Sequence, residues 1–288
     1  MNCPLCGSPS CEIGTKPGRW RTKDYTYRRC EDCSLVFVAN PDRDFSEIYN
    51  EDYYAGKGAD SMVDYCLESK EPGQSIREYE FRGVLQVIRS LTDLNPRTRW
   101  LDYGCGNGEL VRYVRQEADC EIVGFEEGAI AQRAVQSGIP ILSRDELARR
   151  RSQFDVVTAL DVLEHVPDPR VTLREIFELL GSPGVFFYTT GNAQPFRNRI
   201  LDWSYSVPEI HVSLYEPETM RRGLLQAGFD VSWPGYVRGY EGIYRSKILK
   251  NLFVRKKRLL FDLLPWRLVG RLVDKRMGLS LFPVGVKR

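Results

Sequence analysis

The sequence has no long uninterrupted apolar run. No window in its 288 residues approaches the roughly 18 or more apolar residues of a membrane span, and the opening MNCPLCGSPSCEIG lacks the apolar core of a signal peptide. The content of 42% hydrophobic and 28% charged residues is typical of a globular protein that buries a sizeable core. We therefore expect a cytoplasmic protein with one main domain and an accessory module.

Acidic residues are scarce in the C-terminal part of the sequence. Residues 238–288 contain fourteen Lys and Arg but three Asp and Glu, a net charge of +11, whereas residues 1–237 carry −9. Apolar and basic residues alternate there at helical spacing, with an interruption at Pro265. Three interpretations are open: a helical cap with a solvated basic face, an interfacial helix on anionic lipid, and a nucleic-acid contact.

The eight cysteines are arranged in a way that does not favour disulfides. Cys3 and Cys6 form one Cys-x-x-Cys pair, and Cys30 and Cys33 form a second. Two such turns can present four thiolates to one ion, which predicts a structural zinc site in an N-terminal ribbon. A redox dithiol and unligated core cysteines are the alternatives. Four sulfur ligands would leave no open position, so this zinc would stabilise the module and take no part in catalysis.

From about residue 97, apolar strands alternate with amphipathic helices. Strands are predicted within 97–105, 120–128, 154–166 and 184–192, and helices within 109–117, 128–138 and 168–180. This alternation predicts a parallel, doubly wound α/β sheet. Ligands bind such a sheet at the C-terminal ends of its strands, near the reversal in strand order.

The loop after the first of these strands reads LDYGCGNGEL, residues 101–110. Gly104 and Gly106 allow a sharp turn and a close approach to a ligand, and Gly108 allows the next helix to pack near the strand. Glu126 ends the second strand, where an acid can accept hydrogen bonds from both ribose hydroxyls. Asp102 would repel the pyrophosphate of a dinucleotide but suits a cationic ligand.

These residues resemble the class I S-adenosylmethionine-dependent methyltransferases. Asp102 and the three glycines resemble the family's first motif, and FDVVTALDVLEHVPDP at 154–169 resembles its fourth-strand motif. The resemblance implies a seven-stranded Rossmann-like sheet with an antiparallel last strand, and S-adenosylmethionine on the glycine loop with its ribose at Glu126. It also implies that Asp161 and Leu163 lie near the cofactor, with Asp145 as the candidate contact for adenine.

The sequence has only two histidines, and both lie where a base would be useful. His165 follows the fourth strand, and His211 lies in a loop before a helix. Histidine is the usual base for a hydroxyl, an enol or an activated carbon at neutral pH. For His165, a role as a wall of the cofactor pocket is the alternative.

The Glu-x-His segment at 209–211 resembles a Glu-His pair in zinc-ribbon sugar C-methyltransferases. That similarity implies His211 as the base with Glu209 as its acidic partner, and the nearby Tyr215 could line the same pocket. Tyr53 and Tyr54, in IYNEDYYAGK, could close over the substrate, with plain packing as the alternative.

The predicted organisation has four parts: a zinc ribbon at 1–40, a helical linker and lid at 41–95, a methyltransferase core at 96–237, and a basic helical insertion with the last strand at 238–288. We expect methyl transfer to oxygen or carbon of a small polar substrate. The favoured acceptor is a sugar, free or carried on a nucleotide or polyprenyl lipid, in polysaccharide or natural-product biosynthesis.

Two other functions are open. In an RNA methyltransferase, the ribbon and the basic region would hold nucleic acid, but residues 1–35 carry six basic and four acidic side chains, which is nearly neutral. The other is a catalytically inactive scaffold docked at a membrane. The basic region would also allow an active enzyme to lie peripherally on the inner face of the membrane.

Overall fold

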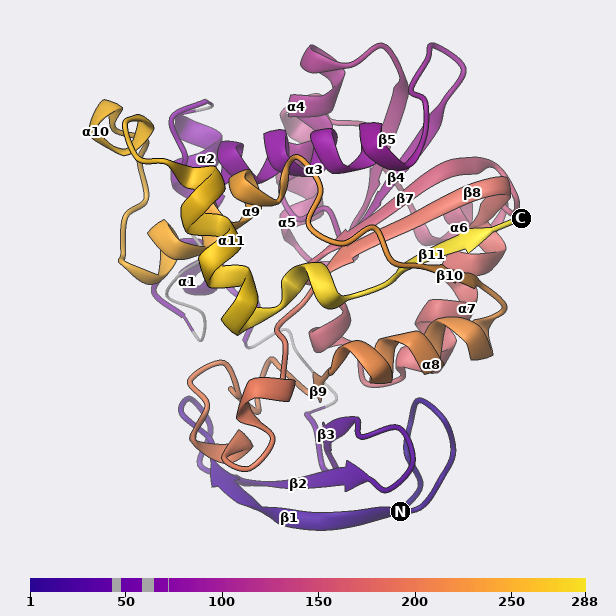
Figure 1. Ribbon diagram of the computed structural model, residues 1–288, viewed down its shortest axis with the longest axis vertical. Coiled ribbons are helices and arrows are strands. Elements are labelled where there is room, and N and C mark those ends of the chain that lie inside the picture. The colour runs from indigo at the N-terminus through magenta and orange to yellow at the C-terminus, as the bar shows by residue number, and fades with distance from the viewer. Residues whose placement is uncertain (43–47, 59–64, 72) are drawn as a thin grey trace. The chain divides into compact units, whose positions relative to one another are not determined.

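The computed structural model describes residues 1–42, 48–58, 65–71 and 73–288 (Figure 1). Residues 43–47, 59–64 and 72, which belong to the predicted linker and lid, lie outside the described residues. The chain divides into two compact units. Unit 1 consists of Met1–Ile48, Arg150–Trp233 and Leu281–Arg288, and unit 2 consists of Tyr49–Arg149 and Pro234–Ser280.

A seven-stranded sheet has the strand order β10-β11-β8-β7-β4-β5-β6. β7 runs parallel to β8, β4 to β5 and β5 to β6, whereas β11 is antiparallel to both β8 and β10. The predicted Rossmann-like methyltransferase sheet with a reversed last strand is thus confirmed. The strands are β4 (Arg99–Tyr103), β5 (Glu121–Phe125), β6 (Ile141–Leu142), β7 (Phe154–Leu160), β8 (Leu180–Thr189), β10 (Asp230–Ser232) and β11 (Val284–Lys287).

Unit 2 surrounds β4, β5 and β6 with helices. Gly242 leaves no room for a side chain beside the Tyr79 carbonyl group, so α3 and α9 approach closely, and α11 lies beside α9 (Figure 1). The helices are α1 (Glu51–Tyr54), α2 (Tyr65–Lys70), α3 (Arg77–Leu91), α4 (Glu109–Glu117), α5 (Ile130–Gln136), α6 (Arg144–Ala148), α9 (Tyr240–Asn251), α10 (Leu259–Asp262) and α11 (Trp266–Met277).

Unit 1 contains a second, four-stranded antiparallel sheet in the order β1-β2-β3-β9. Its strands are β1 (Ser10–Pro17), β2 (Asp24–Cys30), β3 (Val36–Val38) and β9 (Ser213–Leu214). Helices α7 (Pro169–Leu179) and α8 (Pro217–Ala227) lie side by side in the same unit (Figure 1). The N-terminal strands are therefore completed by a strand from far along the chain.

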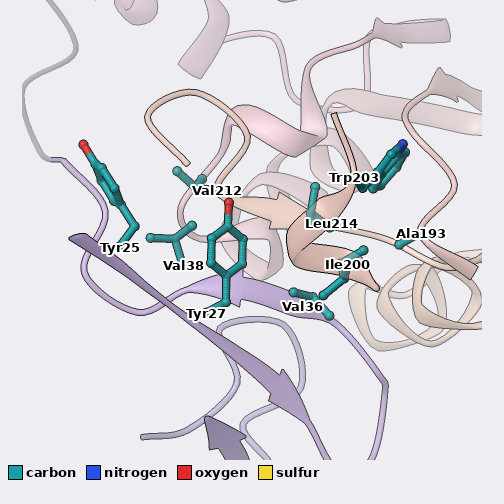
Figure 2. Close-up of a cluster of buried hydrophobic side chains, with 9 residues drawn as sticks. All are labelled: Tyr25, Tyr27, Val36, Val38, Ala193, Ile200, Trp203, Val212 and Leu214. Atoms are coloured by element: carbon teal, nitrogen blue, oxygen red, sulfur yellow. The ribbon is translucent and has the colours of Figure 1, made fainter. Parts of the chain in front are cut away.

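One hydrophobic core joins the N-terminal sheet to the segment that follows β8 (Figure 2). Alternate residues of β2 point into this core because successive side chains of a strand face opposite sides. The segment therefore depends on the N-terminal sheet for its packing. The buried members of the core are Tyr25, Tyr27, Val36, Val38, Ala193, Ile200, Trp203, Val212 and Leu214.

In the part of the chain that the structure describes, no helix is both long enough and apolar enough to cross a membrane.

Candidate active site and metal centre

The four paired cysteines converge in the N-terminal module. The Sγ atoms of Cys3 and Cys33 lie 3.6 Å apart, and those of Cys6 and Cys30 lie 3.4 Å apart. All four sulfur atoms lie within 4.8 Å of one another. Three of the thiols are buried, and Cys6 is half-buried. Four thiols at this spacing fit a tetrahedral all-sulfur zinc site.

The cysteine cluster rests on helix α8. The Thr219 hydroxyl donates a 2.7 Å hydrogen bond to the carbonyl oxygen of Cys33. Leu5, between the first two cysteines, packs so closely on Gly223 that a Cβ atom there would lie 2.9 Å from its Cδ1. The cysteine cluster is therefore packed against other elements of unit 1.

The glycine loop of unit 2 has the conformation that its sequence predicts. Gly104, Gly106 and Gly108 have φ angles of +73°, +57° and +76°, a region that L side chains rarely adopt. The backbone amides of Gly104 and Cys105 donate hydrogen bonds of 2.8 and 3.0 Å to the carbonyl oxygen of Phe125 at the end of β5. The loop thus turns sharply where β4 and β5 end.

The Glu126 carboxylate lies against this loop. It accepts a 3.0 Å hydrogen bond from the backbone amide of Gly106 and a 2.8 Å hydrogen bond from that of Gly128. A carboxylate offers about four acceptor positions, so two remain for other donors. This arrangement fits the predicted role at two ribose hydroxyl groups.

Aromatic residues from the predicted lid lie beside the loop. Tyr53 and Tyr54 are buried against Ile130. Burial, together with the charge of Glu126, raises the pKa of Tyr54 to about 12. The ring of Tyr65 lies 3.0 Å from the position that a Cβ atom of Gly106 would occupy. The structure therefore shows packing beside the glycine loop, and closure over a substrate stays a prediction.

Sequence reasoning missed a polar cluster around Asn107, inside the glycine loop. The Glu68 Oε2 atom lies 3.3 Å from Asn107 Nδ2 and 3.4 Å from Arg77 Nη1. Burial raises the pKa of Glu68 even though Arg77 opposes this shift. Nothing in the sequence around Glu68 distinguishes it from a solvated helix residue.

The remaining predicted cofactor residues are distributed over both units. In unit 2, Asp102 is buried at the end of β4, and Asp145 is exposed in the first turn of α6, directly after β6. In unit 1, Asp161 Oδ1 accepts a 2.8 Å hydrogen bond from Thr189 Oγ1, and Leu163 is fully buried. The contacts of all four residues with a cofactor stay predictions.

The two histidines meet in unit 1. The ring centroids of His165 and His211 lie 4.9 Å apart, and the Tyr205 ring lies 4.0 Å from that of His211. His165 Nδ1 lies 2.9 Å from the carbonyl oxygen of Ile210, and His211 Nδ1 contacts that of Tyr205. A carbonyl oxygen can only accept, so each Nδ1 carries a proton, and in the neutral imidazole Nε2 then carries the lone pair.

A buried acid completes this cluster, and sequence reasoning missed it. Glu164 is fully buried, and its carboxylate lies within 4.8 Å of the ligand atoms of both histidines. Its oxygens accept hydrogen bonds from the hydroxyls of Thr190, at 2.9 Å, and Tyr205. Burial and the nearby Asp161 raise the pKa of Glu164, and burial together with Glu164 raises that of Tyr205.

Glu209 and Tyr215 have other partners than the sequence suggests. The Glu209 carboxylate accepts hydrogen bonds from the backbone amides of Arg19 and Trp20. These amides lie in the turn between β1 and β2. The buried Tyr215 donates a 2.9 Å hydrogen bond to the carbonyl oxygen of Leu163. Glu209 thus holds the hairpin, and Tyr215 holds the turn that leads to His165.

Comparisons with known proteins agree with this architecture. A family model described as a methyltransferase domain matches residues 74–232, more than half of the chain. The ubiquinone biosynthesis O-methyltransferase of Pseudomonas fluorescens strain SBW25 is 34% identical over a 142-residue alignment that covers 41% of this chain and 58% of the relative. The protein of the same name from Salmonella paratyphi A is 35% identical over a 101-residue alignment that covers 32% of this chain and 42% of the relative.

A solved structure shows the same fold. A chain from the complex between the Haloferax volcanii Trm112 methyltransferase activator and a methyltransferase aligns with a TM-score of 0.51 and 17% identity, covering 82% of this chain and 96% of that one. The protein is thus a class I S-adenosylmethionine-dependent methyltransferase by fold. The chain belongs to the methyltransferase domain family, and the family predicted from its sequence is confirmed.

Proposed function

We propose that the protein transfers a methyl group from S-adenosylmethionine to a hydroxyl oxygen of a small acceptor, with His211 as the general base. The observation that supports this is the convergence of both histidines on one buried acid, with both Nδ1 atoms bound to backbone carbonyls. Such an arrangement fixes two imidazoles in the tautomer that can accept a proton at Nε2.

The proposed step needs alignment and one proton transfer. His211 Nε2 takes the proton of the acceptor hydroxyl as the oxygen forms a bond to the methyl carbon, while the bond between that carbon and the sulfonium sulfur breaks. When bound, S-adenosylmethionine supplies this activated methyl group, so the protein chiefly aligns the two reactants. We choose His211 because it is buried and its ring packs against the tilted ring of Tyr205, which restricts it.

Residues of unit 2 would hold the cofactor. The glycine loop allows its close approach, Glu126 has acceptor capacity for the ribose hydroxyls, and the acid Asp102 suits a cationic ligand. Asp145 is a further candidate contact in this unit, and Asp161 and Leu163 of unit 1 stay candidate contacts predicted from the sequence. The four-cysteine cluster would hold one zinc ion that stabilises unit 1.

The acceptor is proposed by chemical class. The relatives are O-methyltransferases by name, which favours oxygen over carbon as the acceptor atom in this chain. We retain the sugar hydroxyl, on a free, nucleotide-linked or polyprenyl-linked sugar, as the candidate acceptor, with a catechol as the comparison. C-methylation of a sugar is the second possibility, and the resemblance of the Glu-x-His segment to sugar C-methyltransferases supports it.

Turnover of methyl-labelled S-adenosylmethionine with a panel of sugars, sugar nucleotides and catechols tests this function. We expect label in a methyl ether of one class, identified by mass spectrometry of the product. Label on carbon would reject O-methylation, and cofactor binding without turnover on any class would favour an inactive scaffold.

A further inference from the structure

The C-terminal helical region exposes large apolar side chains to solvent. Leu259 and Leu263 are 86% and 81% exposed, and Phe253 is 75% exposed. Groups of exposed apolar side chains on a surface mark sites that contact a protein partner or a membrane. We define the apolar face by its members: Leu252, Phe253, Leu259, Leu260, Leu263, Leu264, Leu268 and Leu272.

Helix α11 carries apolar and basic side chains on its outer side. Trp266 and Gly270 are buried, whereas Leu268 and Leu272, four residues apart, are exposed. Residues four apart lie on one side of a helix, so the exposed leucines form one row and exposed cations form the next. This basic stripe consists of Arg267, Arg271 and Lys275.

The inner side of this region already has its partners. The Arg245 guanidinium lies 3.4 Å from the centroid of the Tyr79 ring and 5.2 Å from that of Trp266. Its Nη2 donates a 2.6 Å hydrogen bond to Asp262 Oδ1. The inner side of the region is therefore fully packed. The exposed leucines do not belong to that core.

Not every cation of the region is available to a partner. Lys256 lies 2.6 Å from a Glu71 carboxylate oxygen, and Lys257 lies 2.6 Å from one of Glu78. Those two pairs neutralise part of the sequence run RKKR. The exposed positive charge next to the apolar face thus includes Arg258, directly before Leu259, and the basic stripe of α11.

We infer that the apolar face and the basic stripe together bind the surface of an anionic lipid bilayer. A bilayer surface presents acidic headgroups beside an acyl region, which matches adjacent rows of cations and leucines. A nucleic acid would meet the cations but leave the leucines exposed. Two copies of this segment, each with a net charge of +11, would repel one another.

Vesicle flotation of the full chain tests this inference without using the methyl-transfer reaction. Vesicles of phosphatidylcholine alone are compared with vesicles of equal parts phosphatidylcholine and phosphatidylglycerol. The wild-type protein should float with the anionic vesicles only. Leu259→Asp with Leu263→Asp should weaken partitioning by about tenfold or more, because two apolar anchors are lost and two charges are gained.

A matched control separates the apolar face from general changes in hydrophobicity. Val171 and Leu225 are exposed on α7 and α8 of unit 1, so Val171→Asp with Leu225→Asp should leave flotation unchanged. Arg267→Gln with Lys275→Gln should weaken flotation most at low salt. Circular dichroism and binding of S-adenosylmethionine are measured for every variant, so failure of the methyltransferase proposal is distinguished from failure of this one.

Several outcomes would overturn the inference. They are an absence of flotation, equal flotation with neutral vesicles, or full binding by the Leu259/Leu263 variant. Salt-sensitive RNA retention without flotation would assign the surface to nucleic acid. A dimer that the leucine variant abolishes, again without flotation, would assign it to a second copy.

Discussion

The rings of His165 and His211 lie 4.9 Å apart between centroids, and each Nδ1 lies against a backbone carbonyl oxygen. The two histidines come from different connections of unit 1. The hydrogen bond between the Val212 amide and the carbonyl oxygen of Glu164, at 2.8 Å, ties those connections together. Backbone contacts thus hold the two histidines together and orient both rings before any acceptor binds.

We expect His211→Asn to lower kcat by about 10²–10⁴-fold, the usual range for a positioned base. The Asn side-chain amide can still donate to the Tyr205 carbonyl but has no lone pair for the substrate proton. Initial rates with labelled cofactor give kcat, and calorimetry should show unchanged cofactor affinity. His165→Asn is the control and should lower kcat by less; the opposite ranking would make His165 the base.

Glu164 should make stability depend on pH. Burial raises its pKa in the folded state above the ordinary value of 4.5, so the folded protein keeps a proton that the unfolded chain releases. Stability is then lost as the pH rises through the folded-state pKa, by up to about 1.4 kcal/mol per pH unit. Urea unfolding of wild type and Glu164→Gln from pH 4.5 upward should show a smaller loss in the variant, which keeps only the contribution of other raised acids such as Glu68.

An exposed glutamate supplies the control for that measurement. Glu117 lies at the end of α4 and faces solvent, so Glu117→Gln should follow the wild-type pH dependence. If Glu164→Gln also follows it, then Glu164 is not the group that links protonation to folding.

Much of the fold could be predicted from periodicity and spacing. The helix predicted at 109–117 is α4, and the positive φ angles fall on the three glycines of the loop. Such features are local, because strand alternation and glycine conformations depend on neighbours in the sequence. The spacing within each Cys-x-x-Cys pair is local in the same way, and it predicted the cluster that the two pairs form.

The long-range contacts could not be predicted from the sequence. β9 joins the N-terminal sheet, and Glu209 binds the turn at Arg19 and Trp20, because pairing between distant segments depends on the tertiary fold. The sequence offered one indication of the buried acid, because Glu164 directly precedes the candidate base His165. Its burial, and that of Glu68, depends on packing that no local pattern reveals.

Glu209→Ala should destabilise the protein without acting on the chemical step. It would leave two turn amides without their acceptor, at a cost of about 1–3 kcal/mol. Glu209→Gln keeps an acceptor oxygen and should retain most of the stability. Thermal unfolding together with kcat measured well below the transition checks this; a large fall in kcat for a stable Glu209→Gln variant would restore Glu209 as the acidic partner of His211.

Zinc removal should impair turnover more than cofactor binding. The cysteine cluster and the histidine pair belong to unit 1, whose N-terminal sheet shares a core with the segment before His211 (Figure 2). The glycine loop belongs to unit 2. Cys33→Ser should abolish stoichiometric zinc in elemental analysis and lower the melting temperature by roughly 6–12 °C, for a loss of about 3 kcal/mol.

The exposed Cys11 lies outside the cysteine cluster and gives the control for zinc. Cys11→Ser should retain one zinc ion per chain, full turnover and the wild-type melting temperature. A Cys33→Ser variant with normal zinc content would reject the four-cysteine site, and one that lacks zinc but keeps normal turnover would reject the link to the histidines.

Substitution of two glycines, one in the glycine loop and one outside it, separates the effect of backbone strain from an effect on ligand binding. Gly106 has a φ of +57°, and an added Cβ would lie 3.0 Å from the Tyr65 ring; Gly138 has a φ of +77° but open space around it. Each change to Ala should cost about 1–2 kcal/mol of stability through the left-handed backbone. Only Gly106→Ala should also weaken S-adenosylmethionine binding, by about tenfold or more, because it crowds the loop that approaches the cofactor. Calorimetric titration of both folded variants measures this difference, and equal affinities would remove Gly106 from the cofactor site.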